Sequence, residues 1–366
     1  MSILNHTFPP DLEKIYNANF ANQLAKTQAA IVTLNQARNL LHNPTLLMKP
    51  ILVKEAEASS RLEGTQATIE DVYKNDIEDQ SINKKEDVLE IRNYERAMLR
   101  GIDLVRNTKK LNNFVIREIH KVLLNGVRGE KKNPGKFREN PVWIGEDGTG
   151  VEKARYIAPE HIHIQSLMEL LESYVNLSTE IDINPLIACG VLHHRFEAIH
   201  PFQDGNGRTG RLLISLYLIH RGILTEPMLY ASGYFESNKS EYINQLSKVD
   251  KNEDWQSWLL YFLIGLEKQA NKSMELALAI NTLFKNAELR IQKTKYKIAL
   301  IQALEYCFVK PIITAPILER ATGITVSSSK RYLSKLCEEE IIRDVGIIKN
   351  QRVYINTKLI DTLKNI

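Results

Sequence analysis

HPFQDGNGRTGR, residues 200–211, places a histidine, an aspartate, three glycines and two arginines within twelve positions, directly before the apolar run LLISLYLI. The apolar run predicts a helix over residues 208–220. Because glycine tolerates unusual backbone angles, Gly205 and Gly207 allow backbone N–H groups to approach an anion at the positive end of that helix. The segment therefore predicts an anion-binding loop. It is not the nucleotide-binding P-loop, whose GxxxxGK[ST] pattern needs a lysine that is missing here.

Four side chains give this loop its predicted chemistry. Arg208 and Arg211 stand three positions apart on the expected helix, so their guanidinium groups can converge on adjacent phosphates. Asp204 offers the hard oxygen ligand that Mg²⁺ takes together with substrate phosphates. His200 ends the preceding helical run, where a neutral imidazole can accept a proton from an attacking hydroxyl. A base, a metal ligand and two cations together predict phosphoryl or nucleotidyl transfer.

The whole segment resembles the HPFx[DE]GNGRxxR signature of the Fic family and matches it at every defined position. The resemblance implies transfer of AMP from ATP to a Ser, Thr or Tyr hydroxyl of a target protein, and of the chain itself. It further implies that His200 is the general base, that Asp204 binds Mg²⁺ and that Phe202 packs inward. The residues that it implies for the nucleotide are Gly205, Asn206, Gly207, Arg208, Thr209, Gly210 and Arg211, with Asn206 and the two flanking amides at the α- and β-phosphates.

Two neighbouring segments extend the resemblance. In residues 135–159, the β-type residues Val142, Trp143 and Ile144 precede a Gly-Glu-Asp-Gly turn, which predicts a short hairpin. The resemblance makes this hairpin a flap that docks the target by strand addition. Residues 240–246, SEYINQL, resemble the stretch near the adenine, but Ile243 replaces the second aromatic residue after Tyr242. A purely packing role for Tyr242 therefore stays open.

The segment ASSRLEGTQ, residues 58–66, suggests a built-in inhibitor. Ser59 and Glu63 lie four positions apart on one helical face, and Gly64 is placed to end the helix. Alone, this spacing fits a solvated serine and glutamate. Beside the loop it resembles the family's inhibitory [ST]xxxE[GN] motif, which implies that Glu63 pairs with Arg211 and blocks the γ-phosphate. We expect low basal activity. The same glutamate could instead orient water for AMP removal, and the sequence does not separate these roles.

Helical periodicity dominates the rest of the chain and predicts a mainly α fold, a Fic-type helical bundle with the flap. We expect three parts: an N-terminal helical region over residues 1–107 with the inhibitory helix at about 50–64, a catalytic core over 108–285, and a winged helix-turn-helix over 290–366. The expected helices cover 19–43, 50–62, 87–107, 112–124, 162–176, 185–199, 208–220, 239–249 and 254–283.

The C-terminal part of the sequence suggests an alternative function, DNA binding. Helices over 296–306 and 315–322, a third helix after a cap at Ser327, Ser328 or Ser329, and a strand pair over 343–356 are typical of a winged helix-turn-helix. Lys330, Arg331 and Lys335 on the third helix make a DNA-binding regulator the alternative, although three glutamates close that helix. Such modules also dock proteins or dimerise, so a homodimer stays open as well.

Composition limits the partners and the cellular compartment that we expect. The formal charge of +4 neither requires nor excludes nucleic acid. Cys189, Cys307 and Cys337 form no CxxC pair, which argues against disulfides or a zinc site and fits the reducing cytoplasm. We expect no export signal and no membrane span, since no apolar run approaches about 18 residues. His193 and His194 lack an HExxH pattern and are predicted to pack.

Overall fold

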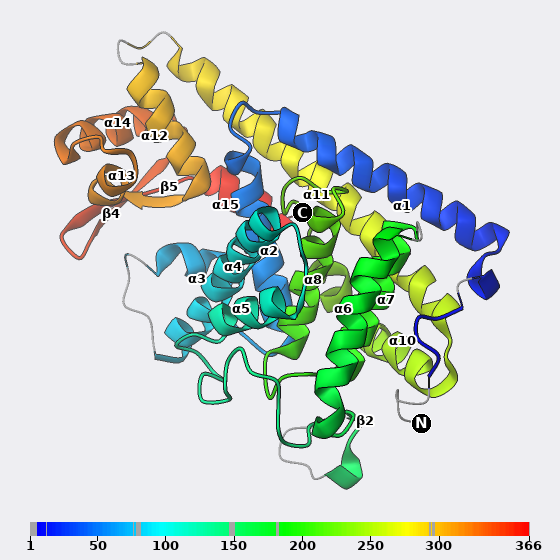
Figure 1. Ribbon diagram of the computed structural model, residues 1–366. Coiled ribbons are helices and arrows are strands. Elements are labelled where there is room, and N and C mark those ends of the chain that lie inside the picture. Colours follow the sequence, from blue (N-terminus) through cyan, green and yellow to red (C-terminus); the bar gives the residue numbers. More distant parts are fainter. Residues whose placement is uncertain are drawn as a thin grey trace.

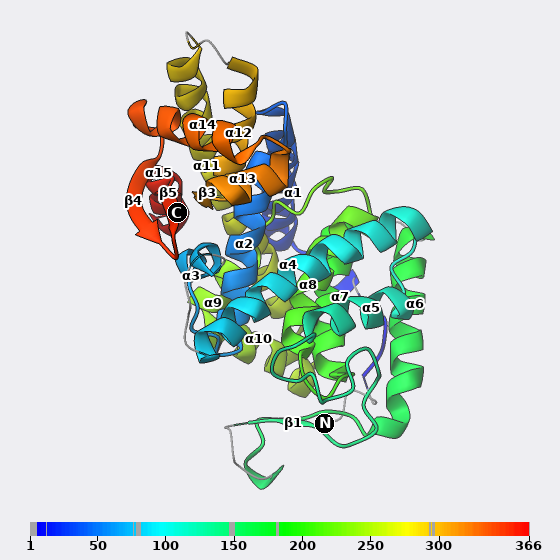
Figure 2. The same ribbon diagram turned by 90° about the vertical axis from the view of Figure 1, so that its left-hand side faces the viewer.

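The structure is a computed structural model and describes residues 6–11, 13–75, 77, 82–145, 151–180, 183–292, 294 and 297–365. The mainly α prediction is confirmed. Two long helices, α1 (Ala18–Gln36) and α11 (Trp255–Ile291), run side by side along one edge of the molecule (Figure 1). A helical bundle lies beneath them. The small β hairpin and the C-terminal module occupy opposite ends of the molecule (Figures 1 and 2).

Helix α8 (Asn206–His220) forms the centre of the bundle, and nearly all of its residues are buried. It packs against α2 (Thr45–Leu62), α4 (Ile82–Thr108), α5 (Asn113–Leu123) and α7 (Pro185–Ile199). A helix that is apolar on every side needs such a position. The loop that joins α7 to α8 is therefore held at the ends of two buried helices.

Helix α7 begins and packs for reasons visible in its sequence. The side chain of Asn184 accepts a hydrogen bond from the Leu186 amide, and Pro185 takes the first helical position, where no N–H is needed. Gly190 allows α11 to approach closely, because a Cβ there would collide with Leu259. The remaining helices of the bundle are α3 (Ile69–Lys74), α6 (Ile164–Glu180), α9 (Ser232–Ser237) and α10 (Lys239–Asn252), with short 3₁₀ turns at Glu13–Ile15, Ala37–Asn39, Val151–Lys153 and His161–His163.

The predicted helices are present, but several differ from the prediction at their ends. Helix α1 ends at Gln36 rather than at residue 43, and α4 begins at Ile82 rather than at residue 87. Helix α2 begins at Thr45 rather than at Pro50, because buried apolar residues on both sides of Pro50 keep the helix packed despite the missing N–H. Helix α11 continues past residue 283, since Phe284, Ala287 and Ile291 prolong its buried face. The short helices α3 and α9 were not predicted, because six residues give too few turns for a clear periodicity.

The predicted hairpin is present. Strand β1 (Trp143–Ile144) pairs antiparallel with β2 (Tyr156–Ile157), and Trp143 lies opposite Ile157. Residues 146–150, which include most of the expected Gly-Glu-Asp-Gly turn, lie outside the described part of the chain. The Tyr156 hydroxyl donates to the Ala198 carbonyl at 2.6 Å, so the hairpin is attached to the end of α7.

The C-terminal module contains α12 (Lys297–Val309), β3 (Ile312–Thr314), α13 (Ala315–Thr322), α14 (Val326–Glu338), β4 (Arg343–Ile348), β5 (Gln351–Ile355) and α15 (Thr357–Asn365). Its sheet has the strand order β3-β5-β4, so β3 is an addition to the predicted strand pair. Thr325, not one of the three serines, caps α14 by accepting from the Ser328 amide. Helix α15 was not predicted either, while the other elements follow the expected order. The assignment to the winged-helix class stays a prediction.

The module packs directly onto the bundle. Helix α12 contacts α2, and α15 contacts α11. The Lys54 ammonium of α2 donates to the Leu363 carbonyl of α15 at 2.6 Å, in a buried position. None of the helices in the described ranges is long and apolar enough to cross a membrane.

Candidate active site

The loop over residues 200–206 is closed by its own side chains. His200 ends α7 in the left-handed region, with φ 50°, and reverses the chain. The Asn206 side chain accepts from the Phe202 amide and donates to the Phe202 carbonyl, both at 2.8 Å. Asn206 therefore braces the loop with its side-chain oxygen and one of its two side-chain N–H groups.

Two residues that the sequence did not reveal hold this loop from outside. The His120 ring stacks on Phe202, with centroids 3.7 Å apart, and its Nε2 faces the Asp204 carbonyl at 2.8 Å. The Arg138 guanidinium donates to the His200 carbonyl at 2.8 Å and to the Pro159 carbonyl at 2.5 Å. Phe202 is fully buried beneath the loop. Together these contacts fix a backbone conformation that a histidine rarely adopts.

The protonation of His200 suits a general base. Its Nδ1 lies 3.3 Å from the Glu197 carbonyl, and because a carbonyl only accepts, Nδ1 carries the hydrogen. The lone pair is then on Nε2. Burial lowers the pKa of His200 to about 4, although the bond to Glu197 acts in the opposite direction. The imidazole is therefore neutral at pH 7 and able to take a proton.

The anion-binding end of α8 is covered by Glu63. A Cβ at Gly207 would collide with the Glu63 carboxylate, so that carboxylate rests directly on the first turn of α8. Gly205 has φ 75°, the left-handed conformation expected where backbone N–H groups turn towards an anion. Asp204 lies beside this point. Its Oδ1 accepts from the Gly205 amide at 2.6 Å, and its side chain is 29% exposed.

Arg211 connects α8 to the C-terminal end of α2. Its Nη2 lies 2.7 Å from the Glu63 carboxylate, so the predicted pair is present. Its Nε donates to the Ser59 hydroxyl and its Nη2 to the Ser59 carbonyl, both at 2.8 Å. Burial works against ionisation of Glu63, but the Arg211 charge outweighs it, and the pKa of Glu63 falls below its usual range. The pair is therefore an ion pair at neutral pH.

The C-terminal end of α2 has further partners. The Arg128 side chain donates to the Glu63 carbonyl at 3.1 Å, and the Lys239 ammonium donates to the Leu62 carbonyl at 2.6 Å. Cations are favourable at the carbonyl end of a helix. Gly64 follows with φ 100°, which confirms it as the helix-ending glycine.

Three residues implied for the nucleotide have other contacts. Arg208 is only 1% exposed and lies between the carboxylates of Glu90, at 3.3 Å, and Asp204, at 3.8 Å, so it organises the loop rather than reaching outward. The Thr209 hydroxyl donates to the Gly205 carbonyl at 2.8 Å. Gly210 has no side chain and packs against α7. Of the two arginines of the motif, Arg211 is thus the one that pairs with Glu63.

The expected adenine residues pack inside the protein. The Tyr242 hydroxyl lies 2.9 Å from His193 Nε2, and its ring stacks on Phe235 with centroids 4.7 Å apart. Ile243 is partly buried against the core. The observed contacts of Tyr242 therefore match the packing role, which is the alternative that the sequence left open. His193 also faces the Gly210 carbonyl at 3.0 Å, and His194 faces the Leu246 carbonyl at 3.2 Å, so the packing prediction for both histidines is confirmed.

Comparisons with curated relatives match part of the chain. A segment of 107 residues is 32% identical to "Protein adenylyltransferase Fic" from Drosophila melanogaster, covering 29% of this chain and 20% of that protein. It is 29% identical to "Protein adenylyltransferase fic-1" from Caenorhabditis briggsae, covering 29% of this chain and 19% of that protein. The match thus spans about one fifth of these relatives' length.

Structural similarity extends over nearly the whole chain. A crystal structure of a Fic family protein from Desulfovibrio desulfuricans G20 superposes with a TM-score of 0.61 at 19% identity, covering 96% of this chain and 98% of that one. At this identity the similarity concerns the fold. Residues 21–103 match the family described as Fic/DOC family N-terminal, and residues 110–218 match the Fic/DOC family itself. With both domains present and the histidine loop complete, the chain belongs to the Fic/DOC family.

Proposed function

We propose that this protein is an adenylyltransferase that moves AMP from ATP to a hydroxyl group of a target protein. One observation carries the proposal: a neutral His200 stands beside the anion-binding end of α8, whose arginine is occupied by a carboxylate of the same chain. A carboxylate held at such a position marks a site built for anions. The names of the two curated relatives support the same reaction.

The reaction follows from the placement of His200 and Arg211. The target hydroxyl donates its proton to His200 Nε2 while its oxygen attacks the α-phosphorus of ATP. The new O–P bond forms as the bond from the α-phosphorus to the bridging oxygen breaks, and pyrophosphate leaves. Backbone amides at the start of α8 and the Arg211 guanidinium stabilise the phosphate charge during this exchange.

A divalent cation fits this site through Asp204. No cluster of three or more His, Cys, Asp or Glu side chains that could hold a metal occurs in the described ranges. Mg²⁺ commonly binds through one or two carboxylates and substrate phosphates, so a single exposed aspartate beside the phosphate position suffices. Asp204 would hold the ion, which neutralises phosphate charge when bound.

Glu63 restrains this activity. The γ-phosphate needs the guanidinium that Glu63 now holds, and the carboxylate also covers the first turn of α8. ATP then binds without this contact or with its α-phosphate out of line. A misplacement of about 1 Å can reduce a rate on the order of 100-fold. A role of Glu63 in removing AMP stays a prediction.

The hairpin is the proposed docking site for the target. Trp143 is 42% and Ile144 38% exposed on β1, next to the loop that carries His200. A two-residue strand pair leaves an edge that another extended segment can join. The three cysteines are free thiols, which fits the cytoplasmic location proposed for the chain.

The test uses ATP labelled either at the α- or at the γ-phosphate, with Mg²⁺, the Glu63→Gly variant and a cell lysate as the source of targets. The proposal expects protein-bound label from α-labelled ATP alone, and none when His200→Ala is added. Label from γ-labelled ATP would instead identify a kinase, and the absence of label from both would reject nucleotide transfer.

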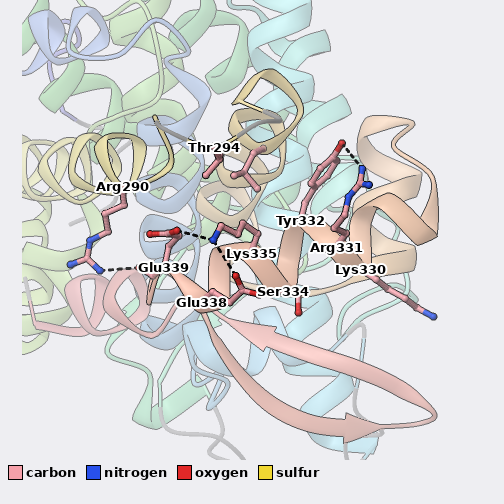
Figure 3. A pocket seen from close by; sticks show the side chains of 10 residues that line it. Arg290, Thr294, Lys330, Arg331, Tyr332, Ser334, Lys335, Glu338 and Glu339 are labelled. Carbon is pink, nitrogen blue, oxygen red and sulfur yellow. Dashed lines mark hydrogen bonds and ion pairs between the residues drawn. The ribbon is translucent and has the colours of Figure 1, made fainter.

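The alternative of a DNA-binding regulator loses one of its expected cations and keeps two. Figure 3 shows the pocket between α11 and α14, where Lys335 lies 3.1 Å from both Glu338 and Glu339. Arg290 donates to the Glu339 carbonyl at 2.9 Å in the same place. Lys335 is thus paired within the protein, whereas Lys330 and Arg331 are exposed on α14. A gel shift of the full chain that weakens steeply with salt would revive this alternative. The homodimer stays a prediction.

A further inference from the structure

Arg211 is bound by Ser59 as well as by Glu63. Of its three hydrogen bonds to the C-terminal end of α2, two go to Ser59, through the hydroxyl and the carbonyl, and one goes to Glu63. All three are between 2.7 and 2.8 Å. When Glu63 moves away, Arg211 therefore keeps two hydrogen bonds to the same helix.

The Ser59 side chain packs against a buried polar cluster. It lies beside Tyr94, whose hydroxyl donates to the Glu55 carboxylate at 2.9 Å. Glu55 also accepts from the Ser232 amide at 2.8 Å and the Ser232 hydroxyl at 2.5 Å. These buried polar groups thus lie between the Arg211 guanidinium and the Glu55 carboxylate.

This cluster joins four helices behind the nucleotide position. Ser59 and Glu55 lie one turn apart on α2, Tyr94 comes from α4, Ser232 from α9 and Arg211 from α8. The two serines and Tyr94 are fully buried, and Glu55 is 2% exposed. Buried hydrogen bonds such as these resist movement, because breaking one leaves an unpaired polar group away from water.

We propose that Ser59, Tyr94 and Glu55 are positioning residues that hold Arg211 ready for the outer phosphates of ATP. The inference rests on the proposed function and deepens it. A free arginine loses much rotamer freedom when it binds, so an arginine fixed in advance binds phosphate more tightly. Ser59 and Glu63 then act in opposite directions: Glu63 blocks Arg211, and Ser59 keeps it in place for the nucleotide.

The test compares variants in the Glu63→Gly background, where the block is absent. Adding Ser59→Ala or Tyr94→Phe removes one hydroxyl from the cluster. We expect the KM for ATP to rise roughly 2- to 10-fold, the usual effect of one lost hydrogen bond, with a smaller change in kcat. Ser59→Thr, which keeps a hydroxyl, should restore the KM.

Two matched controls separate positioning from general loss of packing. Ser60 is the buried neighbour of Ser59 on α2, and Tyr73 is a buried tyrosine on α3; neither hydroxyl has a hydrogen-bond partner among the described residues. Ser60→Ala and Tyr73→Phe should leave the KM unchanged. An unchanged or lower KM in both Ser59→Ala and Tyr94→Phe would overturn the proposal, as would equal effects from the controls.

Calorimetric titration with ATP and Mg²⁺ distinguishes this inference from the function on which it rests. If Glu63→Gly binds ATP but transfers no AMP, the proposed function fails, and the ratio of Kd values with and without Ser59→Ala still decides the role of Ser59. A 2- to 10-fold weaker Kd supports the positioning role of the cluster by the loss of one hydrogen bond. An equal Kd, or no ATP binding by Glu63→Gly, contradicts it.

Discussion

The loop over residues 200–206 and the C-terminal end of α2 meet at Arg211, but they are built in different ways. The loop is closed largely by local bonds, such as those between Asn206 and Phe202, four residues apart. The end of α2 is held by partners far away in the sequence, since Arg211 lies 148 residues from Glu63. The reaction chemistry is therefore encoded locally, and its control depends on the packing of the whole bundle.

The largest expected effect comes from a change in the loop over residues 200–206. His200→Ala in the Glu63→Gly background removes the base and should lower AMP transfer by about 10²- to 10⁴-fold. Affinity for ATP should change little, because His200 makes no phosphate contact in the proposed reaction. Transfer rates and ATP titration on the same protein check both statements, and a rate within tenfold of the parent would remove His200 from its role.

The pH profile tests the same residue without removing it. Burial lowers the pKa of His200 to about 4, so the base is neutral above that pH and is lost as pH falls through about 4. The kcat of Glu63→Gly should therefore stay flat between pH 6 and 8. An inflection near 6.5, the usual histidine pKa, would show that His200 is exposed to water in the active protein.

The smallest expected effect concerns the C-terminal end of α2, which is held by partners far away in the sequence. Arg128→Ala and Lys239→Ala each remove a cation from the carbonyl end of α2, an interaction usually worth about 0.3–1 kcal/mol. Glu63 should release Arg211 more readily, raising wild-type transfer by roughly 2- to 5-fold.

Lys26→Ala, on the exposed face of α1, is the matched control for these two variants. It should leave the rate unchanged. Equal rates in all three variants and the wild type would mean that α2 is held by its buried contacts alone.

What the sequence could predict follows the same division. The loop and the helix after it were predicted, because a motif of fixed spacing specifies them. The Glu63–Arg211 pair joins residues 148 positions apart, and only the resemblance to the family's inhibitory motif implied it. His120 and Arg138 were not, since they reach the loop across 84 and 62 residues and no local pattern marks them. The nucleotide roles expected for Thr209 and Tyr242 do not match their contacts, because both hydroxyls are bonded inside the protein.

The elements were predicted best where periodicity is long. Helix α7 has the predicted ends, since Asn184 and Pro185 mark its start and His200 closes it. The start of α2 was misplaced, because a proline usually precedes or opens a helix and here lies inside one. Strand β3 was missed because three residues carry no recognisable alternation.

The central claim is that Glu63 occupies the arginine that ATP requires. Initial rates of AMP transfer from α-labelled ATP by the wild type and by Glu63→Gly test it most directly, with the Glu63→Gly, His200→Ala double variant as background. We expect Glu63→Gly to be faster on the order of 100-fold, because a phosphate group out of line by about 1 Å reacts that much more slowly. Equal rates, both above the background, would contradict the claim and leave Glu63 as a structural partner of Arg211.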